Sequence, residues 1–420
     1  MSSEQLKDIP PNVGIITIDS DDSDYEQIYK KISRSNVTEL NNCHTLMYKL
    51  PENITSLSFS STFNQSLLPS TLPKQLKILN LKRSNFNHPI RYGMIPNTLE
   101  KLYLDSSYDQ PLEPGVLPSS LKHLFYYGNH NLKVGSLPPN LKVFEYYGDN
   151  FIIENEKGIL PMTLESLIAN ILWLPAIKSL SNLKSLTLLY YGNSEAKIDL
   201  TLLPSSLTTL NVHTGHLISK MPTSIKQLNL FAERYDIEEI FKDRSEYKLE
   251  YLMVNANQYE SLDNLKIKEL DFAIDFGSNE TNVINEIKKV PKGVEKLVIR
   301  HGISLSIKNI PSSVRCLEIQ SLNSLIIEEE QSLPCTLQEL IINDIDHKSF
   351  LNFISHTRTP NNLIFYLQGE RIWLRRIDLN YYLFFSEEPK FISSMVHKSQ
   401  IHNLLEYYMT YQVDYIPKWV

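Results

Sequence analysis

The residues with the greatest potential for chemistry are three cysteines and one close pair of histidines. Cys43, Cys316 and Cys335 share no spacing that is typical of a metal or redox site. His213 and His216 stand in the stretch HTGH and could bind a metal ion, but no third ligand follows at a recognisable spacing. We interpret the pair as lining a loop, and we expect no metal site.

The motifs of common enzymes are also missing from the sequence. G-x-G-x-x-G, the P-loop, G-x-S-x-G and H-E-x-x-H do not occur, and 13 glycines in 420 residues are too few for phosphate-binding loops. A net charge of −7 without a basic stripe disfavours nucleic acid as a partner. We therefore expect no catalytic residues and no cofactor.

The composition and the start of the chain predict a cytoplasmic protein. The first residues, MSSEQLKDIPPNVG, lack the basic and apolar regions of a signal peptide. The longest apolar run, from Ile168 to Ile177, is too short to span a bilayer and contains a proline. We expect neither export nor contact with a membrane.

A repeated phrase, seen in LPSSLKHLFYYG and LPPNLKVFEYYG, organises most of the chain. In 13 units a proline, which we number place 0, is followed by apolar residues at places +3, +6 and +8, with Gln368 as the one polar exception. The prolines that begin these units are Pro10, Pro51, Pro73, Pro96, Pro118, Pro138, Pro161, Pro204, Pro222, Pro291, Pro311, Pro334 and Pro360.

Other units keep the apolar places without the proline. Their +3 residues are Leu183, Leu249 and Ile267, and we expect a degenerate unit between Val37 and Tyr48. The residue at place +6 recurs every 18 to 27 residues, about 22 on average. A regular period of this length indicates a repeat architecture.

The spacing of the apolar places predicts a short strand in every unit. Residues two apart on a strand point to one face, so places +6 and +8 share a face. All the strands run in one direction, and about 17 residues remain for each crossover between parallel neighbours. The sequence therefore predicts a β-rich solenoid of about 16 coils with one parallel strand per coil.

The returning side of each coil is rich in Asn, Ser, Gly and Pro, so we expect it to be mostly irregular. Two stretches there, 235–244 and 346–356, are long and apolar enough for a turn or two of helix. Proline at place 0 fixes φ and lacks an N–H donor, so it suits the irregular segment before the strand.

A second phrase follows the strand in several units. FNQSLLP begins at Phe63, FNHPI at Phe86 and YDQPLEPGVLP at Tyr108. These residues resemble the FNIP repeat, a divergent relative of the leucine-rich repeat named for Phe-Asn-x-Pro-Ile/Leu. The resemblance extends from about Pro51 to Ile342, and the segment after Ile372, IWLRRIDLNYYLFF, also resembles the region that follows such repeats.

The resemblance implies a leucine-rich-repeat-like solenoid that contacts proteins and carries no known chemistry. It also implies that Phe63 and Phe86 fill the core, while Asn64 and Asn87 bond to turn backbone; Tyr108-Asp109 departs from a continuous ladder of asparagines. Some members carry an F-box, which links them to ubiquitin ligases. Here the first 50 residues contain the repeat phrase instead, so we do not carry that role over.

We divide the chain into a cap at 1–50 with the first coil, a repeat solenoid at 51–370 and a cap at 371–420. The first cap contains an insertion, Asp19 to Ser33, whose acidic run is interpreted as a solvated loop; a recruitment patch or phosphorylation at Ser20 or Ser23 is the alternative. Helical spacing within Ser393 to Tyr411 predicts a capping helix, or alternatively a docking helix, with Ile401, Leu404, Leu405 and Tyr408 on one side.

The outward places +5, +7 and +9 predict a site of contact on the concave strand face. Aromatic and polar residues gather there in three consecutive units: Tyr103, His123, Phe125, Tyr127, Glu145 and Tyr147. One interpretation is a ladder of rings that stabilises the sheet. The other is an interface anchor, because clustered aromatic side chains with polar groups are typical of hot spots.

These patterns favour a non-catalytic scaffold or adaptor that binds another protein. One alternative is a substrate-selecting component of a ubiquitin-ligase-type complex, or an enzyme with its chemistry in the tail from Arg371 to Val420. Another is a structural protein that self-associates end to end. The sequence identifies neither the partner nor the oligomeric state.

Overall fold

The structure is a computed structural model of the whole chain. It describes residues 9–19, 24–148, 158–189, 196–232, 234–256, 262–274, 285–327, 333–344, 350, 353, 360–367, 370–386 and 392–405. The chain divides into two compact units, Met1–Gly215 and His216–Val420, which we call unit 1 and unit 2 and describe separately.

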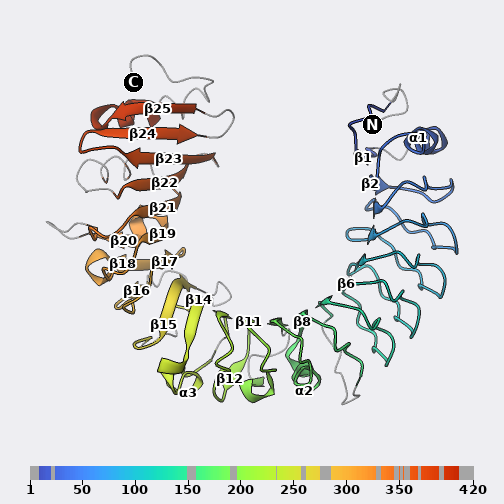
Figure 1. Cartoon of the computed structure of the whole chain (residues 1–420), viewed down its shortest axis with the longest axis horizontal. Coiled ribbons are helices and arrows are strands. Elements are labelled where there is room, and N and C mark those ends of the chain that lie inside the picture. The colour runs from blue at the N-terminus through green and yellow to red at the C-terminus, as the bar shows by residue number, and fades with distance from the viewer. Residues whose placement is uncertain are drawn as a thin grey trace. The chain divides into compact units, whose positions relative to one another are not determined.

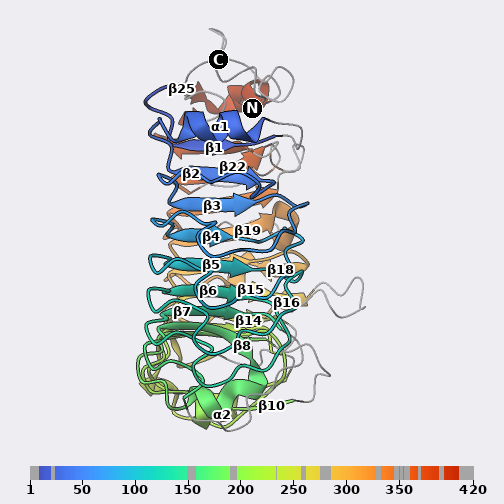
Figure 2. The same cartoon turned by 90° about the vertical axis from the view of Figure 1, so that its right-hand side faces the viewer.

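Unit 1 is a stack of short parallel strands, each paired with the next along the chain. The strands line the inner side of its curve and the returning segments lie outside (Figure 1), while Figure 2 shows β2 to β7 one above another. The strands are β1 (Ile15–Thr17), β2 (Glu39–Cys43), β3 (Ser56–Phe59), β4 (Ile78–Asn80), β5 (Lys101–Leu104), β6 (His123–Tyr126), β7 (Val143–Tyr146), β8 (Ser166–Asn170), β9 (Ser185–Leu189) and β11 (Thr209–Val212).

Unit 2 continues the same parallel pattern and ends in antiparallel strands. The parallel strands are β13 (Gln227–Leu230), β14 (Lys248–Asn255), β15 (Lys266–Ala273), β17 (Lys296–Ile299), β19 (Cys316–Ser321), β21 (Glu339–Asp344) and β22 (Asn362–Leu367). The antiparallel strands are β23 (Glu370–Arg376), β24 (Tyr381–Ser386) and β25 (Ile392–His397).

Short elements occupy the returning segments. Three strands, β16 (Asn285–Ile287), β18 (Ile303–Ser306) and β20 (Leu325–Ile326), form a second parallel sheet in unit 2. The others are α1 (Tyr25–Ile32), η2 (Ile171–Trp173), α2 (Leu174–Ile177), β10 (Lys197–Asp199), η3 (Leu200–Leu202), β12 (His216–Ile218), α3 (Ile237–Ile240), η4 (Arg244–Glu246), η5 (Ile307–Asn309), η6 (Leu322–Ser324) and η7 (Lys398–Gln400). Among the described residues, no helix has the length and apolar character needed to cross a membrane.

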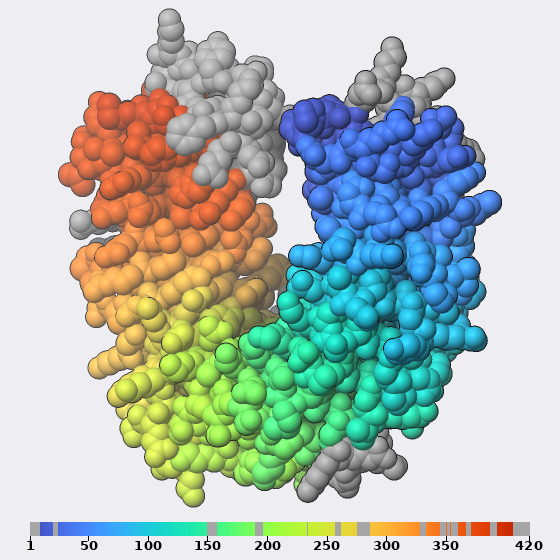
Figure 3. All heavy atoms as spheres, turned by 45° about the vertical axis from the view of Figure 1, so that its right-hand side comes forward, coloured from blue at the N-terminus to red at the C-terminus, as the bar shows by residue number. Residues whose placement is uncertain are grey.

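The predicted apolar ladders form the core of the stack. Leu79, Leu102 and Leu124, all at place +6, lie directly opposite one another on β4, β5 and β6 and have no exposed surface. Figure 3 shows the coils as successive bands of colour. A coil by itself would leave this apolar face in water, so the stacking of neighbours supplies the burial that holds each strand in place.

Proline at place 0 begins a tight turn that leads into the strand. Its carbonyl accepts a hydrogen bond from the backbone N–H at place +3, as in Pro118 to Leu121 and Pro138 to Leu141, at 3.1 and 3.2 Å. Leu180 and Leu183 make the same bond without a proline, at 3.2 Å. The turn geometry is therefore the repeated feature, and proline favours it because its φ is already fixed.

The polar residue at place +2 ties several turns to the coil before them. The hydroxyls of Thr98, Ser120 and Thr163 donate to the +3 carbonyl of the preceding coil at 2.7 to 2.9 Å. Asn53 does the same with its amide, donating to the carbonyl of Val37 at 2.6 Å. In these coils the Ser, Thr or Asn two places after the proline satisfies a backbone acceptor of the neighbouring coil.

One unit differs in register from the sequence prediction. In the last parallel unit Leu363 lies opposite Leu340, at place +6, so the assignment of Pro360 as place 0 was wrong. The polar Gln368 at place +8 was the sequence signal against that assignment. The expected degenerate unit is β2, in which a bulge after Leu40 places Cys43 opposite Phe59.

The insertion of the first cap contains a helix that the sequence analysis did not predict. Asp24 caps the N-terminus of α1, with its carboxylate accepting from the backbone N–H of Gln27 at 3.1 Å. The helix buries Tyr25, Ile28, Tyr29 and Ile32, so the part of the insertion after the acidic run belongs to the core. The helical spacing of these apolar residues was the signal for it. Ser20 and Ser23 lie outside the described residues.

Of the predicted helices, the one at 235–244 is confirmed and the C-terminal one is correct only in part. The helical turns expected at 235–244 are present as α3 and the start of η4. The predicted capping helix is wrong over residues 393–397, which belong to β25 and pair with β24. Residues 401–405 are helical, and Ile401, Leu404 and Leu405 are buried there as expected. Tyr408 lies outside the described residues, as does most of 346–356.

A column of stacked rings, which we call the aromatic spine, runs beside the leucine ladder in unit 1. Successive ring centroids lie 6.3, 5.8, 6.3, 6.1 and 4.6 Å apart, and the rings are at most 1% exposed. In chain order the spine consists of Phe63, Phe86, Tyr108, Tyr126, Tyr146 and Trp173. The expected burial of the two phenylalanines is confirmed, and the column continues well beyond them.

The asparagines of the FNIP phrase also bond as expected. The side-chain oxygen of Asn64 accepts from the backbone N–H of Asn87 at 3.2 Å, and that of Asn87 accepts from Asp109 at 3.0 Å. At the next coil the ladder changes, because the Asp109 carboxylate contacts the imidazole of His130 at 3.0 Å instead. The replacement of Asn by Asp thus ends the series of amide-to-backbone bonds.

Two coils supply the spine ring from a different place in the sequence. Tyr126 and Tyr146 stand at place +8, and their rings fold over the glycine two residues later. A Cβ atom on Gly128 or Gly148 would lie 2.5 Å from the Cζ atom of the tyrosine, which no side chain tolerates. The first tyrosine and the glycine of the YYG sequence therefore belong to the core, where glycine leaves room for the ring.

Replacing the hydroxyl at place +2 tests the bond between coils. We expect Ser120→Ala to lower the free energy of unfolding by about 1 kcal/mol, because a hydrogen bond of this kind contributes roughly that much. Chemical denaturation measures the change. The control is Ser119→Ala, whose exposed side chain should contribute less than about 0.5 kcal/mol; equal effects of the two changes would contradict the role of place +2.

Adding a methyl group at Gly128 tests the aromatic spine. We expect Gly128→Ala to cost about 1–3 kcal/mol, since overpacking of a close-packed core has that effect. Gly14→Ala, where no atom lies within 4 Å of the new Cβ, serves as the control and should be nearly neutral. If the new methyl group clashes with Tyr126, the double variant Tyr126→Leu with Gly128→Ala should lose less free energy of unfolding than the two single variants together. Strictly additive losses in thermal or chemical unfolding would refute the clash.

Candidate functional site

The six residues predicted as a contact site come together on three adjacent strands of unit 1. Parallel pairing places Tyr103 of β5 opposite Phe125 of β6, and Phe125 opposite Glu145 of β7. All six side chains are half-buried. We call this set the aromatic patch: Tyr103, His123, Phe125, Tyr127, Glu145 and Tyr147.

The rings of the patch contact one another across the strands. The Phe125 and Tyr147 centroids are 5.0 Å apart, and Tyr103 meets His123 edge-on at 5.3 Å. The rings of Tyr127 and Tyr147 are stacked with nearly parallel planes, and their centroids are 6.0 Å apart. These distances are typical of favourable aromatic pairs, so the rings hold each other in place and form a preorganised surface.

An imidazole and a carboxylate form the polar part of the patch. His123 Nε2 lies 2.6 Å from Glu145 Oε1, and the Tyr147 hydroxyl donates to Glu145 Oε2 at 3.5 Å. The hydrogen bond from His123 lowers the pKa of Glu145 below its ordinary value, against the opposing effect of burial. Burial, and secondarily the charge of Glu145, raises the pKa of Tyr103. These bonds fix the orientation of the carboxylate.

A lysine that the sequence analysis did not name completes the surface. Lys82 follows β4, and its Nζ lies 3.4 Å from the Phe125 ring centroid and 5.0 Å from that of Tyr103. This geometry is a cation–π contact. Lys82 stands at place +9 of the preceding coil, so the outward places of that coil contained the signal that would have identified it.

A polar cavity of about 600 Å³ adjoins the patch at Lys82, where β2, β3 and β4 end. Its lining combines amides, hydroxyls and two cations around one phenylalanine. The Ser58 hydroxyl donates to Asn41 Oδ1 at 2.8 Å, and Asn80 Oδ1 accepts from the backbone N–H of Lys82 at 2.9 Å. The lining residues are Asn41, Asn42, Ser58, Phe59, Ser61, Asn80, Lys82 and Arg83.

The side chains singled out for metal or redox chemistry lie apart from the patch. His213 follows the end of β11, where burial lowers its pKa, and His216 begins β12. Burial raises the pKa of Cys43 to about 11 and that of Cys316 to about 12, so neither is the reactive thiolate at neutral pH. No group of three metal-binding side chains occurs among the residues that the structure describes.

The strand face of unit 2 presents charged side chains in place of rings. Asp271 is 1% exposed and accepts two bonds from Arg300, 2.9 Å from Nε and 2.6 Å from Nη2. The Tyr251 hydroxyl donates to the same carboxylate at 2.9 Å. These three groups form hydrogen bonds with one another, and the buried carboxylate holds the guanidinium of Arg300 in one orientation.

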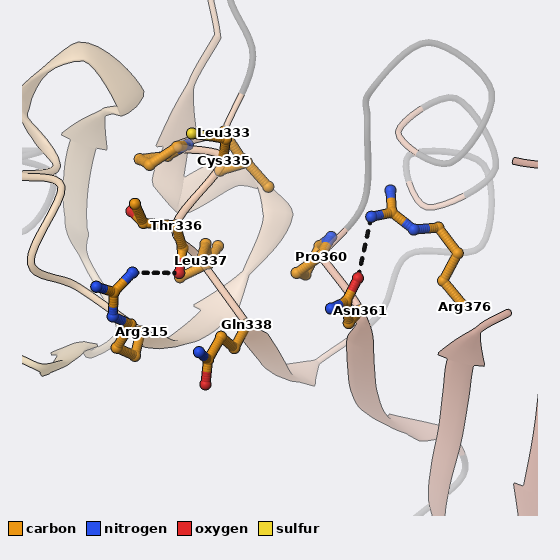
Figure 4. A pocket seen from close by; sticks show the side chains of 10 residues that line it. Arg315, Leu333, Cys335, Thr336, Leu337, Gln338, Pro360, Asn361 and Arg376 are labelled. Carbon is orange, nitrogen blue, oxygen red and sulfur yellow. Dashed lines mark hydrogen bonds between the residues drawn. The ribbon is translucent and has the colours of Figure 1, made fainter. Parts of the chain in front are cut away.

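A second cavity, of about 350 Å³, lies in unit 2 between the turns that precede β21 and β22 (Figure 4). Arg315 donates to the carbonyl of Thr336 at 3.0 Å, and Arg376 donates to Asn361 Oδ1 at 3.0 Å. Cys335 contributes a thiol, but the lining includes neither a histidine nor a carboxylate that could act as its base. The cavity therefore has no complete catalytic arrangement.

Parallel strands recurring once per coil over shared apolar ladders define the class: a leucine-rich-repeat-like β solenoid with few helices. Within this class, the FNIP Repeat family matches three consecutive segments, residues 48–84, 86–125 and 129–168. The resemblance inferred from Phe63, Phe86 and Tyr108 is thus confirmed within residues 48–168, which carry FNIP repeats. Five of the six patch residues lie in the matched segments, and Tyr127 falls between the second and the third.

Two solved structures are similar to this chain. One is described as CroV588, a novel circular LRR protein; it is 18% identical over 78% of this chain and 55% of that one, with a TM-score of 0.48. The chain therefore spans about half the length of that protein. The other is a leucine-rich repeat protein from Bacteroides ovatus, 14% identical over 86% of this chain and 91% of that one, with a TM-score of 0.16. No curated protein sequence matches.

Removing the charge of Glu145 tests the electrostatics of the patch. Because its folded pKa is lowered from 4.5, the ionised carboxylate stabilises the fold above that pH, and the contribution disappears as the pH falls through the lowered value. We expect Glu145→Gln to cost roughly 1 kcal/mol at pH 7, and we expect the cost to shrink as the pH falls through the lowered pKa of the carboxylate.

Unfolding in denaturant at a series of pH values measures this difference. Glu113→Gln removes a solvent-exposed carboxylate and is the matched control, with an expected effect below about 0.5 kcal/mol at every pH. A penalty for Glu145→Gln that stays constant while the wild-type carboxylate becomes protonated would show that the substitution acts through packing and not through charge.

Proposed function

We propose that this chain is a non-catalytic scaffold that binds another protein through the aromatic patch of unit 1. The observation that carries the proposal is the patch itself: four aromatic rings, an imidazole and an oriented carboxylate remain half-exposed on adjacent strands. Tyrosine is enriched among the residues that dominate binding energy, and rings that are already held in place lose little entropy on binding.

The restriction of the rings to three coils supports an interface more than a structural ladder. While the coil directly after the patch has the aliphatic Ile168 at place +7, most coils on either side stack in the same register with small or polar residues there. These residues are Ser58, Asn80, Thr187 and Asn211. Since stacking proceeds without rings in those coils, sheet stability does not explain why the rings gather in one place.

The chemistry of the described residues agrees with a binding role. The buried thiols are protonated at neutral pH, and the cavity beside the tail supplies no base. The alternative of an enzyme with its chemistry in the tail therefore gains no support from the described part of the tail. Light scattering on the purified chain tests the remaining alternative, self-association.

A variant that removes the rings tests the proposal. In the native cell, we expect Tyr103→Thr, Phe125→Thr and Tyr127→Thr together to lower proximity labelling of a specific set of proteins by at least about tenfold. Loss of one or two hot spots of about 1.4 kcal/mol or more gives this factor. Threonine is chosen because it suits a strand.

The control replaces three exposed apolar side chains that lie outside the strands. Met47→Thr, Leu68→Thr and Tyr92→Thr, at sites 80, 57 and 86% exposed, should leave the labelling unchanged. Thermal unfolding is measured for every variant. Labelling that survives loss of the patch, or that falls only in step with the melting temperature, would overturn the proposal.

A further inference from the structure

The polar cavity beside the patch carries two positive charges and no negative one. Lys82 and Arg83 both belong to its lining, which includes no carboxylate. Lys82 contacts the faces of Phe125 and Tyr103. Among the described residues neither Lys82 nor Arg83 forms an ion pair, and the rings, solvent and the more distant charge of Glu145 surround Lys82.

Three carboxylates on neighbouring strands and turns accept hydrogen bonds from other donors. Asp105 accepts from the backbone N–H groups of Arg83 and Ser106, at 2.9 and 2.8 Å. Glu39 accepts from the Asn41 amide at 2.8 Å, and Glu145 is held by His123. The positive side chains of the cavity therefore remain available to an anion from outside.

Neutral hydrogen-bond donors in the cavity could bind the same external anion as the two cations. The Oδ1 atom of Asn80 accepts from the backbone N–H of Lys82, which orients the amide so that its Nδ2 is available as a donor. The Ser61 hydroxyl lines the same space. An ammonium, a guanidinium, an amide and a hydroxyl around one cavity are the groups that bind a carboxylate.

We propose that the partner binds as an acidic segment, with an Asp or Glu carboxylate in the polar cavity and a neighbouring apolar side chain on the aromatic patch. Lys82 joins the two parts, because it lines the cavity and lies on the rings. This inference rests on the proposed function and deepens it by naming the partner's chemistry.

Because the chain is negatively charged overall, binding of an acidic segment depends on Lys82 and Arg83. The chain carries a net charge of −7, so an acidic partner gains no long-range attraction from the molecule as a whole. Binding then depends on the contacts of Lys82 and Arg83 at short range. Removing these two charges should therefore abolish binding to acidic partners, where a diffuse electrostatic attraction would only weaken it.

Selection from a phage-displayed library of random 12-residue peptides tests the inference on the full chain. We expect the peptides enriched on the wild type to combine Asp or Glu with an adjacent aromatic or aliphatic residue. The charge variant, Lys82→Met with Arg83→Asn, should lose this enrichment. Methionine keeps the length of the side chain, and asparagine suits the positive φ of position 83, which is 63°.

The most enriched peptide is then synthesised with a fluorescein label, together with its counterpart in which Asn or Gln replaces the acid. Fluorescence anisotropy should show at least tenfold weaker binding for the amide peptide and for the charge variant. The loss of binding free energy for the amide peptide and the loss for the charge variant should not add, because both changes remove the same contact. Lys30→Met with Arg34→Asn, which removes equal charge at α1 and the segment that follows it, should change binding less than twofold.

The outcomes separate the inference from the proposed function. Peptides that need the rings but are indifferent to Lys82 and Arg83 overturn the inference and leave the proposed function standing. Peptides that need the two cations but not the rings contradict the proposed function and retain the cavity as a site for acidic peptides. A library that yields the same peptides on the wild type and on the charge variant overturns the inference outright.

Discussion

Each coil of this protein can bury its apolar side chains only against the next coil, and the rest of the structure depends on this contact. Leu79, Leu102 and Leu124 show the consequence: they are completely buried, yet each belongs to a strand of three or four residues. So short a strand is not stable alone. In-register stacking supplies both the burial and the backbone hydrogen bonds.

Stacking also explains why polar residues recur near each turn. The irregular returning segments leave backbone carbonyls that no strand partner can satisfy. Ser120 and its equivalents at place +2 supply hydroxyl donors to these carbonyls, while Asn64 and Asn87 accept from backbone N–H groups on the other side of the coil. The repeat phrase therefore encodes hydrogen bonds between coils as well as the apolar core.

The aromatic spine shows how one spatial requirement is met by different sequence solutions. Phe63 and Phe86 reach the column from the segment after the strand, whereas Tyr126 reaches it from the strand itself. The second solution requires Gly128, because any side chain there would collide with the ring. A close-packed interior fixes the position of the ring in space but not its position along the chain.

The outward places of the strands are free of these constraints, and there the two units differ. Unit 1 presents rings with Lys82 and Glu145, while unit 2 presents the buried Asp271 with Arg300. A solenoid can vary this face without disturbing its ladders, since inward and outward side chains alternate along each strand.

The sequence by itself determined the solenoid, the direction of its strands and the six residues of the aromatic patch. Period and alternation are local properties, so places +6 and +8 predict buried ladders and places +5, +7 and +9 predict neighbours on the outer face. Only the tertiary structure decided the bulge before Cys43, the register at Leu363 and the helix at Tyr25, because pairing and packing against neighbouring residues fix all three. It also decided that Lys82 lies on the ring of Phe125, since a contact between residues 43 positions apart depends on which coils stack and in which register.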